Sequence, residues 1–200
     1  IAEQLKAGLD AEQAFVGNQA GDAKAALAGA AKKIEAVYAY PYQNHACMEP
    51  MNCTAQVKNG KVTVWAPTQV PQMARDIAAL VAGVPKDAVT VHVTMLGGGF
   101  GRRLEVDFVA QAVRVAMDCA CRPVQLLYSR EEDMQHDFYR PASLVRMRAG
   151  LNAAGAVTAW DMRIASPSII ATLLKLPLKD GVDPQSVASY SDQPYDIPNV

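Results

Sequence analysis

The chain lacks long apolar runs and a large excess of charge of either sign. Its apolar stretches fall short of the roughly 20 residues that a membrane-spanning helix requires. Half of the 200 residues are hydrophobic, a fifth are charged, and the formal net charge is −1. This balance argues against a general nucleic-acid binder and against a polybasic membrane-surface protein. The length and apolar content allow one domain with a core, with or without appendages.

Paired-cysteine metal motifs are also missing. The four cysteines are Cys47, Cys53, Cys119 and Cys121, without a CxxC pair and without a histidine at zinc-finger distance. We interpret them as small buried thiols and leave a disulfide open as the alternative. The sequence starts at Ile1 without a basic and then apolar leader, so we expect an excised piece whose targeting signal would lie upstream.

The apolar pattern predicts an α+β fold, in which a mixed β-sheet carries helices packed on one side. We expect strands at 34–40, 54–57, 61–66, 89–95 and 123–128, and a later hairpin of strands at 143–149 and 157–164. Asn59-Gly60 is a hairpin signal between two of them. Short or amphipathic helices are expected at 22–27, from Pro71 to Gly83, and from Glu105 onward.

Two of these helices have a predicted buried face. In the helix that begins at Pro71, this face consists of Met73, Ile77, Leu80 and Val81; in the later helix it consists of Val106, Val109, Val113 and Met117. We expect three segments along the chain: a peripheral N-terminal arm at 1–30, a mixed α/β domain at 31–166, and a connection to a missing domain at 167–200.

A glycine-rich stretch, Leu96-Gly97-Gly98-Gly99-Phe100-Gly101-Arg102-Arg103, lies between a predicted strand and a predicted helix. Glycines without Cβ atoms let a ligand approach the backbone, and N–H groups near a helix start favour an anion. Arg102 and Arg103 add fixed positive charge. The Rossmann spacing fails because Arg102 stands where its last glycine belongs, and the Walker pattern lacks its Lys-Ser or Lys-Thr. A tight turn that lets the helix pack on the strand is the structural alternative.

Two further stretches are candidate sites. Gln43 to Glu49 is polar within apolar surroundings, and it is either a surface loop or one wall of a cavity in which Gln43 and His45 form hydrogen bonds. Arg130 to Arg140 has the composition of a solvated charged loop. Within it, Phe138 and Tyr139 could hold Arg140 against an aromatic or anionic ligand.

In this order the stretches resemble the molybdenum hydroxylases, the xanthine dehydrogenase and aldehyde oxidase group. Within it, the resemblance is strongest to the beta (large) chain of the isoquinoline 1-oxidoreductase branch and its membrane-bound aldehyde dehydrogenase relatives. It extends from about Ile34 to Val200. The motifs that carry it are Gln-x-His-x-x-x-Glu at 43–49, Gly-Gly-Gly-Phe-Gly at 97–101, Arg-Pro-Val at 122–124, Ser-Arg-Glu-Glu-Asp-Met at 129–134 and the stretch from Asp133 to Pro141.

The resemblance implies a molybdenum-cofactor-binding domain of the xanthine dehydrogenase and aldehyde oxidase type. The cofactor would be molybdenum on molybdopterin cytosine dinucleotide, to which such proteins contribute no metal ligand. The reaction would hydroxylate N-heteroaromatics of the isoquinoline kind or oxidise aldehydes, with water as the oxygen source. By this resemblance the cofactor-binding residues are Gln43, Gly98, Gly99, Phe100, Gly101 and Arg102. Arg140 would bind substrate.

The resemblance also implies partners and a limit. The chain would work with the remaining part of a large subunit, with a small [2Fe–2S] subunit and with a cytochrome c electron acceptor. A bacterial periplasmic or membrane-associated location is favoured. The glutamate base of the family lies in a Gly-x-Gly-Glu setting that is absent here, so no residue of this chain is expected to be catalytic. Glu49 is a poor candidate, and Glu105 is offset by one from the family's pattern.

We therefore expect the chain alone to hold no molybdenum and to be inactive. The alternative is a stand-alone nucleotide- or anion-binding module that catalyses nothing.

Overall fold

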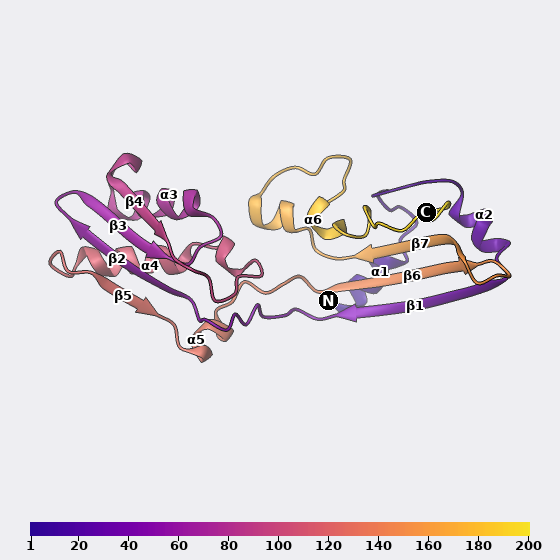
Figure 1. The fold of residues 1–200 in the computed structure, drawn as a ribbon, viewed down its shortest axis with the longest axis horizontal. Coiled ribbons are helices and arrows are strands. Elements are labelled where there is room, and N and C mark those ends of the chain that lie inside the picture. Colours follow the sequence, from indigo (N-terminus) through magenta and orange to yellow (C-terminus); the bar gives the residue numbers. More distant parts are fainter. The chain divides into compact units, whose positions relative to one another are not determined.

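Residue contacts divide the chain into two units. The computed structural model describes residues 1–200, except for the side chains of residues 173 and 174. The first unit contains Ile1–Gln43 and Pro141–Val200, and the second contains Asn44–Arg140 (Figure 1). The expected segments at 1–30, 31–166 and 167–200 remain a prediction about domain organisation.

The first unit is built on an antiparallel sheet in the order β1-β6-β7 (Figure 1). Its strands are β1 (Lys32–Tyr40), β6 (Ser143–Leu151) and β7 (Val157–Ala165). The predicted hairpin of β6 and β7 is confirmed. Helices α1 (Ala2–Leu9) and α2 (Ala23–Ala28) lie against β6 and β7. The strand expected at 34–40 forms, but it pairs with β6 and not with the strands at 52–66.

The C-terminal segment also belongs to this unit. It contains a π-helical turn (Ile170–Leu174) and the short helix α6 (Pro184–Val187). The carboxylate of Asp183 accepts hydrogen bonds from the backbone N–H groups of Gln185 and Ser186 and so caps α6. Val200 exchanges two backbone hydrogen bonds with Ala20, and the Asn199 carbonyl accepts from Trp160 of β7. These bonds tie the last residues to the first unit.

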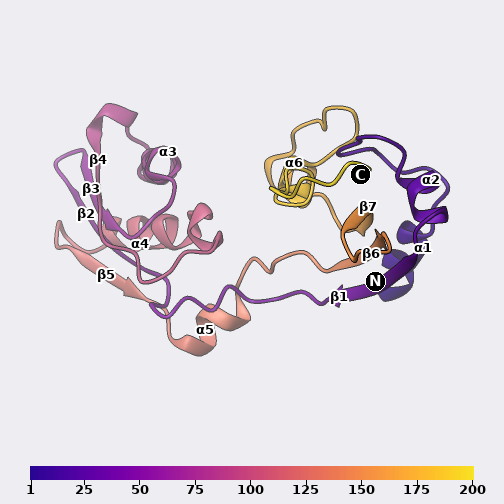
Figure 2. The same cartoon turned by 45° about the vertical axis from the view of Figure 1, so that its right-hand side comes forward.

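The second unit contains a mixed sheet in the order β4-β3-β2-β5 (Figure 2). Its strands are β2 (Asn52–Lys58), β3 (Lys61–Ala66), β4 (Val89–Val93) and β5 (Val124–Leu127). Asn59 and Gly60 both have positive φ in the turn that joins β2 to β3, which confirms the predicted hairpin. Strand β4 pairs parallel to β3 after a helical crossover.

Two helices pack against each other and on this sheet, namely α3 (Pro71–Ala82) and α4 (Asp107–Met117). The predicted buried face of α3 is wrong at two of its four positions, because Met73 and Leu80 are exposed and Ala74 and Ala78 are fully buried. Small side chains let the helix axis approach its neighbours closely. In α4 the apolar face is confirmed around Val109 and Val113, although Met117 is 40% exposed.

Three short helices complete the second unit. A 3₁₀ turn (Lys86–Ala88) precedes β4, another (Arg102–Leu104) precedes α4, and α5 (Arg130–Gln135) follows β5. The helix expected from Glu105 therefore begins two residues later, at Asp107. The solvated loop expected at 130–140 is wrong in its first half, where the Ser129 hydroxyl accepts from the N–H of Glu132 and caps a helix. The fold class is confirmed as mixed α and β, with two sheets.

In the part of the chain that the structure describes, no helix has both the length and the apolar character needed to cross a membrane.

Candidate functional site

The glycine loop, residues 97–101, follows β4 and has an unusual backbone. Gly98 and Gly101 have φ of +102° and +106°, a region that favours glycine. Phe100 between them has φ of +53°, which costs a bulky residue about 1–3 kcal/mol and persists only where the surroundings impose it. Arg140 contributes to this restraint, since its Nη2 donates to the Phe100 carbonyl at 3.3 Å. The Phe100 ring itself is 64% exposed.

All five carbonyl groups of the glycine loop accept hydrogen bonds from the protein. The Gly97 carbonyl accepts from the Glu49 N–H (3.1 Å), and the Gly98 carbonyl accepts from Arg103 Nε (2.7 Å). The Gly99 carbonyl accepts from both the Arg102 N–H (2.8 Å) and the Cys47 thiol (3.4 Å). The Phe100 carbonyl accepts from the Arg140 guanidinium, and the Gly101 carbonyl accepts from the Leu104 N–H (3.1 Å). The loop therefore offers no free carbonyl to a ligand.

The N–H groups of the same loop divide differently. The Gly97 N–H donates to Glu49 Oε2 at 2.9 Å, and the Gly101 N–H donates to Gln69 Oε1 at 3.1 Å. Among the described residues, the N–H groups of Gly98, Gly99 and Phe100 have no acceptor. Successive unpaired N–H groups of a loop can bind an oxygen atom that carries negative charge when they point the same way.

Close packing behind the loop explains two of its glycines. A Cβ on Gly97 would lie 2.4 Å from the Cβ of Glu49, and one on Gly99 would lie 2.6 Å from Gln69 Oε1. Contacts this short require a neighbour to move. The tight-packing alternative therefore accounts for these two positions, while the free N–H groups belong to half-exposed and exposed residues, where water or a ligand can bind them.

Arg103 holds the glycine loop against the Gln43–Glu49 stretch. Its side chain is fully buried, and its Nη2 lies 2.8 Å from Glu49 Oε2. It also donates to the backbone carbonyls of Gly98, Pro67 and Glu49. The charge expected beside the loop is thus inside the protein, where a carboxylate neutralises it.

Arg102 is buried in a second charged cluster. Its guanidinium forms a bidentate pair with Asp107 at 2.8 and 2.9 Å and lies 5.1 Å from the centre of the Phe138 ring. Its Nε lies 3.3 Å from Asp137 Oδ1, which is an ion-pair distance without the alignment of a hydrogen bond. Both carboxylates compensate the buried cation, so Arg102 can act on a ligand only through the position of the loop.

His45 belongs to the same cluster. Its Nδ1 lies 2.9 Å from Asp137 Oδ1, and its backbone N–H donates to Asp137 Oδ2 at 2.6 Å. The two side chains are only 9% and 2% exposed. Nearby, partial burial and the charge of Asp107 raise the pKa of Glu105. Glu105 is therefore more easily protonated than an exposed glutamate.

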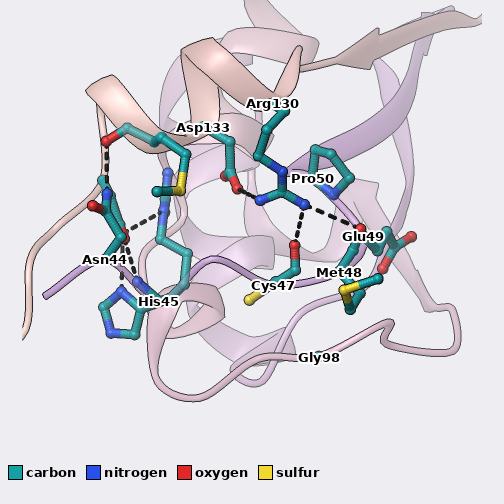
Figure 3. A network of polar contacts seen from close by, with 12 residues as sticks. Asn44, His45, Cys47, Met48, Glu49, Pro50, Gly98, Arg130 and Asp133 are labelled. Atoms are coloured by element: carbon teal, nitrogen blue, oxygen red, sulfur yellow. Dashed lines mark hydrogen bonds and ion pairs between the residues drawn. The ribbon is translucent and has the colours of Figure 1, made fainter.

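Arg130 connects α5 to the stretch that follows Gln43 (Figure 3). Its Nη1 donates to Asp133 at 3.0 Å, while its Nη2 donates to the carbonyls of Cys47 and Met48. Asn44 donates to the Met134 carbonyl at 2.6 Å. Charged residues of this segment thus fix the backbone beside the glycine loop.

The cysteines differ from the prediction in part. Cys47 and Cys53 are buried free thiols, whereas Cys119 is half-buried and Cys121 is exposed. Burial raises the pKa of Cys47 and raises that of Cys53 to about 12, so both stay neutral. Across the described residues, no three His, Cys, Asp or Glu side chains gather as a metal site.

The structure brings most predicted site residues together in one unit. The loop residues Gly98 to Gly101, Arg102 and Arg140 belong to the second unit, whereas Gln43 is exposed at the end of the first. Sequence reasoning missed Gln69, Asp107 and Asp137. Asp107 had a local signal, as an acidic residue in the first turn of α4 and five positions after Arg102, and Asp137 lay in the motif at 133–141.

Sequence comparison identifies the family. The profile of the molybdopterin cofactor-binding domain matches residues 9–200. The chain belongs to this family. Its relatives place it in the group of xanthine dehydrogenases and aldehyde oxidoreductases.

Several relatives of this molybdopterin-binding domain have similar identity. They include a subunit of nicotinate dehydrogenase from Pseudomonas putida (30% identical over 82% of the chain and 14% of the relative), the aldehyde oxidoreductase molybdenum-binding subunit PaoC of Escherichia coli K12 (33%, 70% and 19%) and the beta subunit of isoquinoline 1-oxidoreductase from Brevundimonas diminuta (32%, 68% and 18%). The chain spans less than a fifth of their length. Their similar identities do not single out the isoquinoline branch.

Solved structures agree at the level of the fold. The aldehyde oxidoreductase of Desulfovibrio gigas matches 80% of the chain and 19% of its own chain, with a TM-score of 0.60 and 20% identity. Quinoline 2-oxidoreductase of Pseudomonas putida 86 matches 80% and 22%, with a TM-score of 0.58 and 21% identity.

Proposed function

We propose that this domain is part of the catalytic subunit of a molybdenum hydroxylase. The subunit would hydroxylate N-heteroaromatic compounds or oxidise aldehydes, with water as the source of oxygen. The observation that carries the proposal is the row of three unpaired N–H groups at Gly98, Gly99 and Phe100, in a loop whose carbonyls are all bonded inward. Such a row suits the oxygen-rich, electron-rich centre of a molybdenum cofactor.

The residues fit this group by the chemistry that they offer. A molybdenum–molybdopterin centre, when bound, supplies the redox chemistry of the hydroxylation. The glycine loop would bind oxygen atoms of this centre through backbone N–H groups, which are uncharged and do not titrate. Gln43 belongs to the first unit, and its proposed side-chain hydrogen bond to an oxygen of the group rests on the sequence resemblance alone.

The arginines have separate parts in this proposal. Arg102 and Arg103 are buried beneath the loop and paired with carboxylates. They would therefore fix the spacing of the three N–H groups without contact with the cofactor. Arg140 is exposed, and one of its nitrogens is bonded to the Phe100 carbonyl. The rest of its guanidinium remains available to orient an aromatic or anionic substrate.

Finer features rest on the sequence resemblance alone. The cytosine dinucleotide form of the cofactor, a small [2Fe–2S] subunit, a cytochrome c acceptor and a periplasmic or membrane-associated location are proposals of this kind. The substrate class is equally a proposal, because relatives named for nicotinate, isoquinoline and aldehydes lie within a few per cent of each other in identity.

The test is turnover by the complete large subunit that contains this domain, together with its iron–sulfur partner. Isoquinoline, nicotinate and an aromatic aldehyde would be supplied with an artificial electron acceptor in water labelled with oxygen-18. We expect a hydroxylated or carboxylic product that carries the label. Product oxygen derived from O₂ would contradict the proposal, as would no turnover by the metal-loaded complex of any N-heteroaromatic compound or aldehyde.

A further inference from the structure

His45 has one ring nitrogen that the protein does not use. Its Nδ1 is engaged by Asp137, whereas in the described part of the chain no hydrogen-bond partner is found for Nε2. The side chain is only 9% exposed, and Nε2 does not belong to the fully buried polar atoms without a partner, so this nitrogen is accessible from outside the protein. A fixed imidazole whose unused nitrogen remains accessible can accept a hydrogen bond from a bound ligand.

The orientation of the ring is fixed from several sides. The carboxylate of Asp137 contacts the ring Nδ1 of His45 and accepts a hydrogen bond from its backbone N–H, and the Asp137 side chain is 2% exposed. Arg102 lies beside this carboxylate and is locked by Asp107. Since a carboxylate at Nδ1 favours a proton there, a neutral ring carries its lone pair on Nε2. His45 is then an acceptor whose direction is set before any ligand binds.

The free nitrogen faces the glycine loop. A Cβ on Gly101 would lie 3.4 Å from His45 Nε2 and 3.8 Å from its Cδ2. Gly101 directly follows Phe100, whose N–H is the last of the three unpaired donors. Glycine at this position therefore leaves the acceptor uncovered beside the row of donors.

We propose that His45 is a ligand-binding residue of this site, whose Nε2 accepts a hydrogen bond from an N–H or O–H group of the bound pterin cofactor. The inference rests on the proposed function and adds an acceptor to a site otherwise made of donors. The matching ligand offers an oxygen to the loop N–H groups and a donor within reach of Gly101. A pterin, which carries ring N–H groups beside oxygen-bearing positions, has this chemistry.

Two substitutions separate this role from support of Asp137. His45→Asn keeps an amide near the Nδ1 position and leaves nothing at Nε2, whereas His45→Gln places an amide oxygen near Nε2. In the complete, cofactor-loaded subunit, release of the pterin is followed by the fluorescence of its oxidised form. We expect His45→Asn to release it about three- to tenfold faster than wild type, as for one lost hydrogen bond, and His45→Gln to stay within about twofold. Equal release from both variants, or faster release from His45→Gln, would overturn the inference.

A second measurement does not depend on the cofactor. In the 200-residue chain, nitrogen-15 NMR of the His45 ring reports which nitrogen carries the proton. A proton on Nδ1 and a lone pair on Nε2 are expected, and the opposite tautomer would overturn the inference. If the wild-type subunit contained no pterin at all, the proposed function would fail, while the tautomer result would stand on its own.

Discussion

At the scale of single residues, Arg103 shows how a motif residue can stabilise a site without touching the ligand. It joins three segments of the chain, through Glu49, the Pro67 carbonyl and the Gly98 carbonyl. A guanidinium has five donors in a fixed planar arrangement, which suits one carboxylate and several carbonyls at once. Lysine could not satisfy the same set of acceptors.

Replacement of Arg103 tests this role. Arg103→Met leaves the Glu49 carboxylate without its cation and three carbonyls without a donor, so we expect a loss of about 3–5 kcal/mol in the free energy of unfolding. Urea denaturation measures it. The control is Arg114→Met, because the Arg114–Asp118 pair is exposed and its loss should cost about 0–1 kcal/mol. Equal effects in both variants would show that Arg103 is not a central stabilising residue.

The contacts of single residues that are far apart in the sequence could not be predicted. The glycine loop and Arg140 could be selected from motif order, whereas Asp137 stood in the motif at 133–141 without an assigned role. It is 35 residues from Arg102 and 92 residues from His45, its two partners. Contacts between residues so far apart depend on how α5 and the segment after it fold back. The residue pattern of 130–140 predicted a solvated loop because it does not encode these long-range contacts.

At the scale of elements, local sequence signals were reliable where a strand pairs with the next strand along the chain. The Asn59-Gly60 turn fixes the β2–β3 register, and the β6–β7 hairpin follows from alternation around another short turn. The assignment of β1 to a separate sheet was not predictable, because its partner β6 comes about 100 residues later. Alternation identifies a strand but not its neighbour.

Helix α3 illustrates a second limit at this scale. Hydrophobicity points to Met73 and Leu80 as core residues, whereas the structure buries Ala74, Ala78 and Ala79. The helix contacts both α4 and the sheet strands, and small residues permit this close approach. Size decides which face is buried here, and hydrophobicity alone does not encode it.

Matched substitutions in α3 test this orientation. Ala78→Leu adds bulk at a fully buried position and should lower the free energy of unfolding by about 1–3 kcal/mol. Leu80→Ala removes a side chain that is 75% exposed and should change it by about 0.5 kcal/mol or less. Denaturation of both variants of the 200-residue chain measures the difference. A larger loss from Leu80→Ala would mean that α3 presents its other face.

At the scale of the whole molecule, most of the groups that we propose to bind a ligand lie in one of the two units. The unpaired N–H groups of the glycine loop, the His45 acceptor and Arg140 all belong to the second unit. The sequence predicts no catalytic base in this chain. The relatives are more than five times longer than the matched segment, so the proposed activity belongs to a larger subunit.

The most direct test of cofactor binding by the glycine loop is the molybdenum and pterin content of the complete subunit and of two glycine variants. Gly99→Val places a side chain against Gln69 and should displace the free N–H groups, while Gly29→Val adds the same side chain in the first unit, at an ordinary φ of −84°. We expect close to one molybdenum per wild-type and Gly29→Val subunit, and at least about tenfold less in Gly99→Val. A wild-type subunit without molybdenum, or a Gly99→Val variant as fully loaded as the control, would contradict the account.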